Sequence, residues 1–154
     1  MERPEINWDR TGSFTAGTVG PQGRRVFFLQ ASYEDQVLSL KVEKQQMAGL
    51  ADFLMSMLND LPPKDDSDLL DSTSGETKFM DPGEPDWVIG SLGVTYEQSG
   101  DKLILIAEEL TRDEDSIPAQ ARLTLSRLQV EHFIQIAQEL ISAGRPPCPY
   151  CGSP

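Results

Sequence analysis

The chain has 154 residues, enough for one domain with a substantial hydrophobic core, and 25 acidic residues outnumber its 13 lysines and arginines. A net charge of −12 argues against nucleic acid and against a membrane surface as partners, because both require clusters of basic residues. The sequence has no apolar run of the roughly 18 residues needed to span a membrane, no secretory signal and only two cysteines. We therefore expect a cytoplasmic protein.

The first half of the chain predicts three strands followed by a helix. A strand is expected at residues 13–19, and the turn after it has proline and glycine at positions that suit a type I turn. Residues 25–33 are rich in aromatic and β-branched side chains, and residues 36–42 alternate, so both predict strands. Residues 44–61 predict a helix with one apolar stripe, formed by Met47, Leu50, Ala51, Leu54, Met57 and Leu58.

Two prolines end this helix and begin a linker, which we place at residues 62–86. From Asn59 to Asp86 the chain has nine acidic residues and two lysines, with few large apolar side chains. This composition predicts a flexible, solvated loop rather than an acidic binding tail, and such a loop contributes little to stability. Its apolar pairs, Leu69-Leu70 and Phe79-Met80, are the places where it could dock on the fold.

The second half predicts the same order of elements. Strands are expected at residues 87–97, 102–109 and 121–125, and a helix at 128–143 that Gly144 is placed to cap. Three segments of the first half recur here, namely 14–20 as 87–93, 26–29 as 103–106 and 40–47 as 123–130.

This repetition predicts a single α+β domain over residues 1–154, built from a duplicated βββα unit at 13–61 and 87–143. Short links within each unit favour antiparallel neighbours, so we expect a six-stranded, largely antiparallel sheet with two helices and a pseudo-two-fold axis. Residues 26–29 and 103–106 are apolar at successive positions, which indicates burial of both strand faces. Either the sheet curls into a partial barrel, or a second subunit covers its free face.

The tail at residues 144–154 contains the one motif with a clear chemical meaning, Cys148-Pro149-Tyr150-Cys151-Gly152. This is the form of a zinc knuckle, in which two thiolates can reach one ion. Structural zinc takes four ligands, and the chain ends three residues after Cys151. We therefore expect an incomplete zinc site, or one shared between chains. A redox role is disfavoured because the pair follows a helix C-terminus, where the dipole does not lower a thiol pKa.

Other candidate residues are weaker. The single histidine, His132, lies on the polar face of its predicted helix and is interpreted as solvated. Gly17 and Gly90 lie inside strands, where they indicate bulges or close packing; a ligand cradle would need a glycine loop leading into a helix. Arg24, Arg25 and Trp87 could line a ligand pocket, although such residues more often flank turns or fill cores.

We find no catalytic residues in the sequence. No Ser/His/Asp set is readable, and a single histidine removes most acid–base schemes. Glu108 and Glu109 are adjacent in a predicted strand, so they point to opposite faces.

Several of these segments together resemble a bacterial family known as domain of unknown function 3090, whose members are often called repeat proteins. The resemblance is carried by Phe14-x-Ala16-Gly17-Thr18-Val19-Gly20, Arg25–Ala31, Val42-Glu43-Lys44-x-Gln46 and, most specifically, Ala143-Gly144-Arg145-Pro146-Pro147-Cys148-Pro149-x-Cys151-Gly152. The family implies no activity or substrate. Its members usually continue into a further His and Cys that would complete a zinc site, which implies that Cys148 and Cys151 are metal ligands.

Two functions follow as hypotheses. The first is a non-enzymatic protein-binding or assembly module, which docks another protein or forms a homodimer. The alternative is an enzyme, or the partner subunit of one, with a small-molecule site between the two repeat units.

Overall fold

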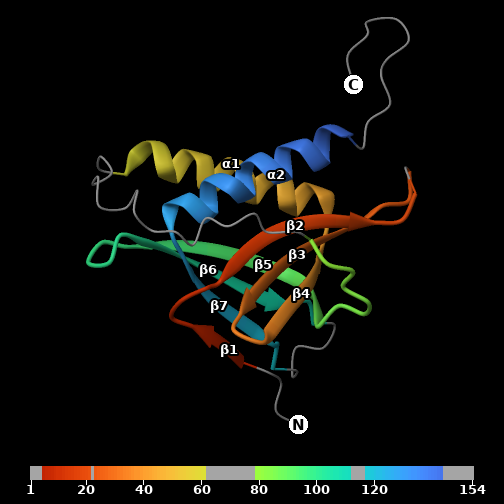
Figure 1. Cartoon of the computed structure of the whole chain (residues 1–154), viewed down its shortest axis with the longest axis horizontal. Coiled ribbons are helices and arrows are strands. Elements are labelled where there is room, and N and C mark those ends of the chain that lie inside the picture. The colour runs from red at the N-terminus through yellow and green to blue at the C-terminus, as the bar shows by residue number, and fades with distance from the viewer. Residues whose placement is uncertain (1–4, 22, 62–78, 112–116, 144–154) are drawn as a thin grey trace, which may run out of the picture.

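The computed structural model describes residues 5–21, 23–61, 79–111 and 117–143 (Figure 1). The strands in this part of the chain are β1 (Glu5–Trp8), β2 (Ser13–Val19), β3 (Val26–Tyr33), β4 (Gln36–Val42), β5 (Trp87–Glu97), β6 (Lys102–Glu109) and β7 (Gln120–Leu125). The helices are α1 (Lys44–Asp60), which follows β4, and α2 (Arg127–Ala143), which follows β7.

All seven strands form one sheet in the order β1-β7-β6-β5-β4-β3-β2. Neighbours are antiparallel except at two places, β1 beside β7 and β4 beside β5, where they are parallel. The expected α+β class with two helices and a large sheet is confirmed, whereas the expected six strands are wrong. The seventh is β1, whose four residues are too few to show the alternation by which a strand is predicted.

The sheet curls on itself, as one of the two expected arrangements required. Side chains of β2, β3 and β4 meet side chains of β6 and β7 around a single cavity of about 10 Å³, lined by Phe14, Leu29, Gln30, Ala31, Leu38, Leu40, Leu105 and Leu123. These two groups of strands are separated by β5 in the sheet, so they can touch only if their inner faces turn toward each other. The result is a partial barrel with a continuous apolar interior.

Both helices cover the concave face and pack against each other (Figure 1). The α2 helix also contacts β2, where the rings of Phe14 and Phe133 lie 4.7 Å apart. Met47 and Leu54 of α1 and Phe133 of α2 are fully buried, and each such side chain stabilises the fold by roughly 1.5–3 kcal/mol. Within the described residues, neither helix is long and apolar enough to cross a membrane.

The convex face of β2, β3 and β4 is covered by residues 79–86, which we call the docked segment. The buried side chain of Gln30 holds its backbone, accepting a hydrogen bond from the Met80 N–H at 2.8 Å and donating one to the Met80 carbonyl at 3.0 Å. At the other end the Asp86 carboxylate accepts a hydrogen bond from the Ser39 N–H at 2.8 Å. The end of the expected linker is therefore part of the fold, while its residues 62–78 lie outside the described part of the chain.

Candidate functional site

The three residues expected to line a pocket do not lie together. Trp87 is 4% exposed and belongs to the core at the start of β5, where it pairs with Leu40. Arg24 is exposed in the turn between β2 and β3. Arg25 is half-buried and lines a hollow at the start of α1. None of the hollows described below is lined by more than one of these three residues.

The residues considered for metal binding also give no site in the described structure. His132 is exposed on α2, and Cys148 and Cys151 lie outside the described residues. Among the residues that are described, no three side chains of His, Cys, Asp or Glu come close enough to hold an ion.

The two strand glycines have different structural roles. Gly90 lies at a break in the register between β5 and β6, as expected for a bulge, and a Cβ there would be 2.7 Å from the Cα of Leu110. Gly17 lies in an unbroken ladder opposite Phe28. A Cβ on Gly17 would be 2.1 Å from the ring of Phe79, so this glycine admits the docked segment.

An apolar hollow lies between α1 and β5, and therefore between the two halves of the chain. We call it the inter-half groove. Its volume is about 450 Å³, and it is lined by Gln46, Gly49, Leu50, Phe53, Gly90, Ser91, Leu92, Gly93 and Val94. Phe53, a large apolar side chain on the wall of the groove, is 52% exposed to solvent.

Gly49 has no internal explanation. It lies in the middle of α1, where glycine costs roughly 1 kcal/mol relative to alanine. Its φ is not positive, and a Cβ there would meet no atom within 4 Å. Positions 46, 49 and 53 share one helix face, so the missing side chain leaves space on the wall of the groove.

The polar groups of the groove are already bonded. Gln46 accepts a hydrogen bond from the Glu43 N–H at 2.9 Å and donates one to the Ile89 carbonyl at 3.4 Å. Ser91 donates to the Glu108 carboxylate at 3.1 Å. The groove therefore presents mainly apolar surface to an occupant.

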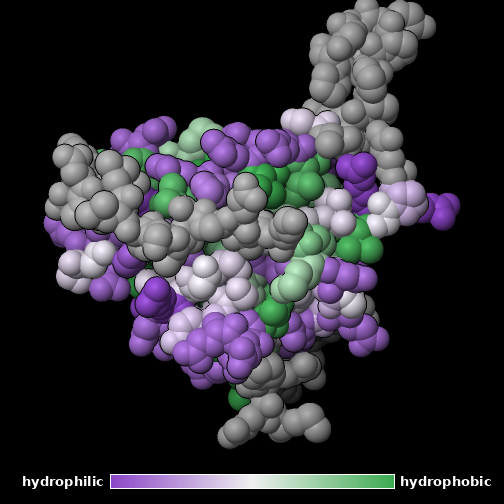
Figure 2. All heavy atoms as spheres, in the orientation of Figure 1, coloured by the Kyte–Doolittle hydropathy of each residue, from purple (hydrophilic) through white to green (hydrophobic). Residues whose placement is uncertain are grey.

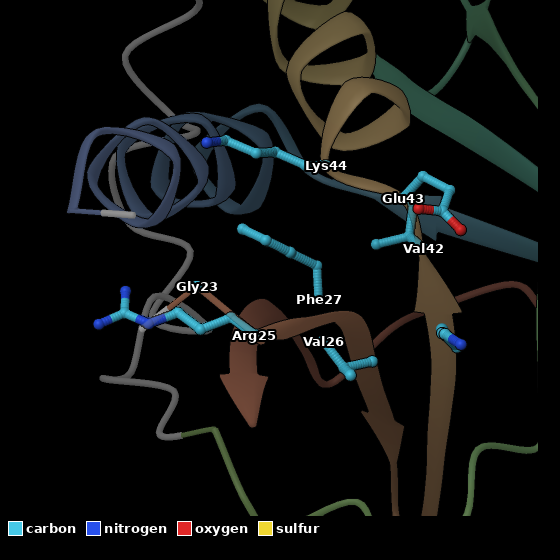
Figure 3. Close-up of a pocket in the computed structure, with 8 residues that line it drawn as sticks. Gly23, Arg25, Val26, Phe27, Val42, Glu43 and Lys44 are labelled. Carbon is cyan, nitrogen blue, oxygen red and sulfur yellow. The ribbon is translucent and has the colours of Figure 1, made fainter. Parts of the chain in front are cut away.

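A second hollow, of about 370 Å³, lies at the start of α1 (Figure 3). Arg25, Lys41 and Lys44 line it together with Glu43, and Phe27 points between Arg25 and Lys44. Its basic lining contrasts with the strongly acidic composition of the chain.

A third hollow, of about 430 Å³, lies at the start of α2 and is named the α2 hollow. It is lined by Asp9, Arg10, Thr11, Lys102, Thr124, Ser126 and Gln129. Thr11 is only 2% exposed, and its Oγ1 has no hydrogen-bond partner. The Gln129 amide donates to the Thr11 carbonyl at 2.7 Å and so fixes this loop against the helix.

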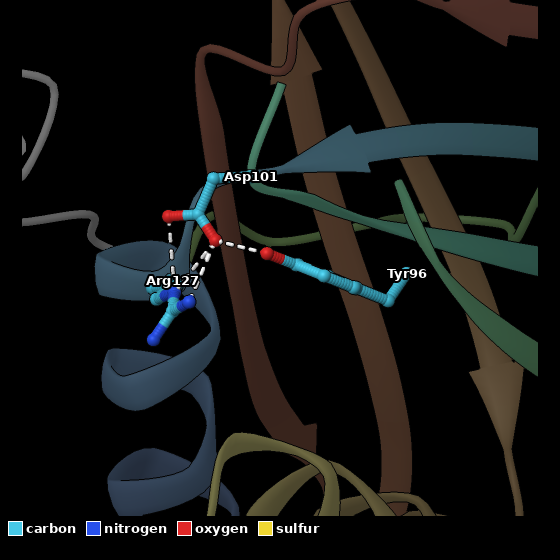
Figure 4. A network of polar contacts seen from close by, with 3 residues as sticks. All are labelled: Tyr96, Asp101 and Arg127. Carbon is cyan, nitrogen blue, oxygen red and sulfur yellow. Dashed lines mark hydrogen bonds and ion pairs between the residues drawn. The ribbon is translucent and has the colours of Figure 1, made fainter. Parts of the chain in front are cut away.

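A polar triad ties α2 to the β5–β6 hairpin (Figure 4). The Arg127 guanidinium donates from Nε and Nη2 to the Asp101 carboxylate, the shortest contact being 2.7 Å, and the Tyr96 hydroxyl donates to the same carboxylate at 2.6 Å. The hydrogen bond to Asp101 is the main cause that raises the pKa of Tyr96, and it also raises the pKa of Arg127. Both side chains thus keep their protons, which suits a structural tie.

The fold and these hollows define an α+β protein with one curled, mixed sheet, two helices on its concave face and concave sites at the helix starts and between the halves. The chain belongs to the family described as "Protein of unknown function (DUF3090)", whose model matches residues 6–154. No curated protein and no solved structure matches the chain.

The sequence suggested a site between the two halves but not the residues that line the inter-half groove, because its walls come from residues far apart in the chain, such as Gln46 and Ser91. One local signal was available. A glycine at position 49 interrupts a helix whose apolar stripe is otherwise complete. The α2 hollow had no local signal, since Thr11 is an ordinary loop threonine in the sequence.

Proposed function

We propose that the protein is a non-enzymatic binding module that holds a small, uncharged apolar molecule in the inter-half groove. The observation that carries this proposal is Gly49, a destabilising residue that neither the backbone nor internal packing requires. A ligand that occupies the space beside Gly49 would explain why this position has no side chain.

The size and lining of the groove support a small molecule. Ligand sites commonly enclose roughly 300–1,000 Å³ and are mainly apolar, and the groove has about 450 Å³ between Leu50 on the helix and Leu92 and Val94 on the strand. No charged residue lines the groove, and the side chains of Gln46 and Ser91 already bond within the protein, so burying a charged ligand there would be unfavourable.

We further propose that the two halves arose by duplication of a βββα unit. Leu40 pairs in parallel with Trp87, and Leu123, at the position 83 residues beyond Leu40, pairs in parallel with Trp8. The third residue of each helix is a glutamine that donates a hydrogen bond to a carbonyl two or three residues after the paired tryptophan. Gln46 donates to the Ile89 carbonyl, after Trp87, and Gln129 donates to the Thr11 carbonyl, after Trp8. These matches favour a first unit that begins with β1 rather than at residue 13.

A homodimer is the second proposal, and exposed apolar side chains favour it. In addition to Phe53 at the groove, Leu110 and Ile117, on the connection between β6 and β7, are 57% and 72% exposed. Sedimentation velocity at increasing concentration tests this directly, and a monomer throughout would contradict it. We also propose a cytoplasmic location, and zinc bound by Cys148 and Cys151 only where further ligands are supplied.

The groove is tested by titration with the neutral dye N-phenyl-1-naphthylamine, whose fluorescence rises on transfer from water to an apolar site. Gly49→Leu is expected to fill the groove and abolish saturable binding. Asn59→Leu, exposed near the end of the same helix and outside the groove, is the matched control and should bind like the native protein. Equal binding by the Gly49→Leu variant would contradict the proposal.

A further inference from the structure

The strand registers show which residues hold corresponding places in the two halves of the sheet. In each half one row of paired residues crosses three strands and ends on a tryptophan of a fourth. The two rows are Ala16, Leu29, Leu40 and Trp87 in one half, and Val94, Leu105, Leu123 and Trp8 in the other. Phe14 precedes Ala16 by two residues, as Leu92 precedes Val94, so Phe14 and Leu92 correspond. This correspondence differs from the sequence repeat, which aligns Phe14 with Trp87.

The two helices correspond in the same way. Each has 17 residues, and the third residue is a glutamine, Gln46 in α1 and Gln129 in α2. Each glutamine accepts a hydrogen bond from the N–H just before its helix and donates one to a backbone carbonyl. Leu50 lies four residues after Gln46, as Phe133 lies four residues after Gln129, so Leu50 and Phe133 also correspond.

These corresponding places are packed differently in the two halves. Between α2 and β2, the rings of Phe14 and Phe133 are both buried and lie 4.7 Å apart. Between α1 and β5, leucines take both positions, and these two residues, Leu50 and Leu92, line the inter-half groove. The helix does not close the space, since α1 contacts β5 far less than α2 contacts β2. The groove therefore lies where the other half has two aromatic rings.

The walls of the groove suit a ring that carries no charge. Phe53 is half-exposed on its wall, and paired aromatic rings gain stability beyond the area that they bury. Gly49, exposed on the same helix, places no side chain at the opening. No charged residue lines the groove, whereas the coloured surface in Figure 2 is mainly hydrophilic. A buried charge would be unfavourable in the groove, and an aromatic ring would cover Phe53.

We propose that the inter-half groove binds a small, uncharged molecule with a flat aromatic ring system, in the place that Phe14 and Phe133 fill in the other half. The rings would lie against Leu50 and Leu92 and beside Phe53. An apolar cavity of roughly 150 Å³ suffices for benzene, so a groove of about 450 Å³ admits a bicyclic molecule. This inference rests on the function proposed above and adds the class of ligand to it.

The ligand class is tested at neutral pH with 2-naphthol and its saturated analogue decahydro-2-naphthol, by NMR of the full chain with labelled leucine methyl groups. One equivalent of 2-naphthol should bind and shift the methyl signals of Leu50 and Leu92 through its ring current. It should bind roughly three- to tenfold more tightly than the analogue, the equivalent of one ring–ring contact. Phe53→Leu should remove this preference, and Met55→Leu, exposed on the same helix outside the groove, should leave it unchanged.

A second variant rebuilds the packing of the other half. Leu50→Phe combined with Leu92→Phe should fill the groove, abolish 2-naphthol binding and raise the unfolding midpoint. Leu92 is half-buried, so Leu92→Phe alone should fold and weaken binding about tenfold even if the double variant does not fold.

Unchanged affinity of Leu92→Phe for 2-naphthol would overturn the proposal. Equal or tighter binding of decahydro-2-naphthol by the native protein would also overturn it, while leaving the proposed apolar site intact. If 2-naphthol, its analogue and the apolar dye all failed to bind, both this inference and the proposed function would be wrong.

Discussion

The contact between the docked segment and the sheet can be tested by a double-mutant cycle on Gly17 and Phe79. An alanine at position 17 would place its Cβ 2.1 Å from the Phe79 ring, which therefore has to leave its site. The Phe79→Ala variant removes the same ring directly. If the Phe79 ring stabilises the fold only while it lies against Gly17, both substitutions remove the same stabilising contact.

The magnitude follows from the burial of the ring. Fully buried phenylalanines lose about 3–5 kcal/mol on truncation; Phe79 is half-buried against Gly17 and Phe28, so we expect roughly 2 kcal/mol. Gly17→Ala should cost about 1–1.5 kcal/mol, because alanine regains roughly 0.4–1 kcal/mol by restricting the unfolded chain. In the Phe79→Ala background only the gain of roughly 0.4–1 kcal/mol should remain, so Gly17→Ala should stabilise the fold there, which gives a coupling energy of about 2 kcal/mol.

Urea unfolding at constant slope measures all four proteins. Gly93→Ala is the matched control, because it is also a strand glycine but a Cβ there meets no atom within 4 Å. Its effect should be small and equal in both backgrounds. Additivity of Gly17→Ala and Phe79→Ala within about 0.5 kcal/mol would refute the contact.

Three other outcomes are expected. The hydrogen bond that raises the pKa of Tyr96 stabilises the fold fully at pH values below the ordinary pKa of 10.0, and this contribution is lost as the pH rises through the folded-state pKa. Asp101→Asn should lower the pKa of the Tyr96 phenol, measured by NMR of labelled tyrosine, and should remove this dependence of stability on alkaline pH. Replacing residues 62–78 with a shorter Gly/Ser linker should leave the unfolding midpoint nearly unchanged, whereas extending the replacement through 79–86 should lower it clearly. Metal analysis should find no stoichiometric zinc in the monomer, and Cys148→Ser should abolish any zinc found in a dimer.

Most of the elements were predictable because their signals are local. Strands β2, β4, β5 and β6 begin and end at the predicted residues, since turns with glycine, or with the tight Glu34-Asp35 link, bound alternating or apolar runs. The apolar stripes of the two helices predicted where each helix begins and ends to within one residue.

The sequence did not predict features that depend on distant partners. The isolated β1 strand is too short to form alone, and pairing with β7 stabilises it. The docked segment reads as a polar loop because the group that holds it, the Gln30 side chain, is about 50 residues away. The hollows depend in the same way on where the sheet brings remote side chains.

The parallel pairing of β1 with β7 has a consequence for the order in which the protein can fold. Glu5 pairs with Gln120, and the hydrogen bond from Gln129 to Thr11 spans 118 positions. Residues 5–11 can therefore reach their native contacts only after residues 120–129 have been synthesised. During synthesis, residues 5–8 leave the ribosome long before their partner strand exists. Closing so large a loop is slow relative to forming the hairpins β2–β3–β4. The amino-terminal strand therefore joins last, and the sheet has an open edge beside β7 until it does.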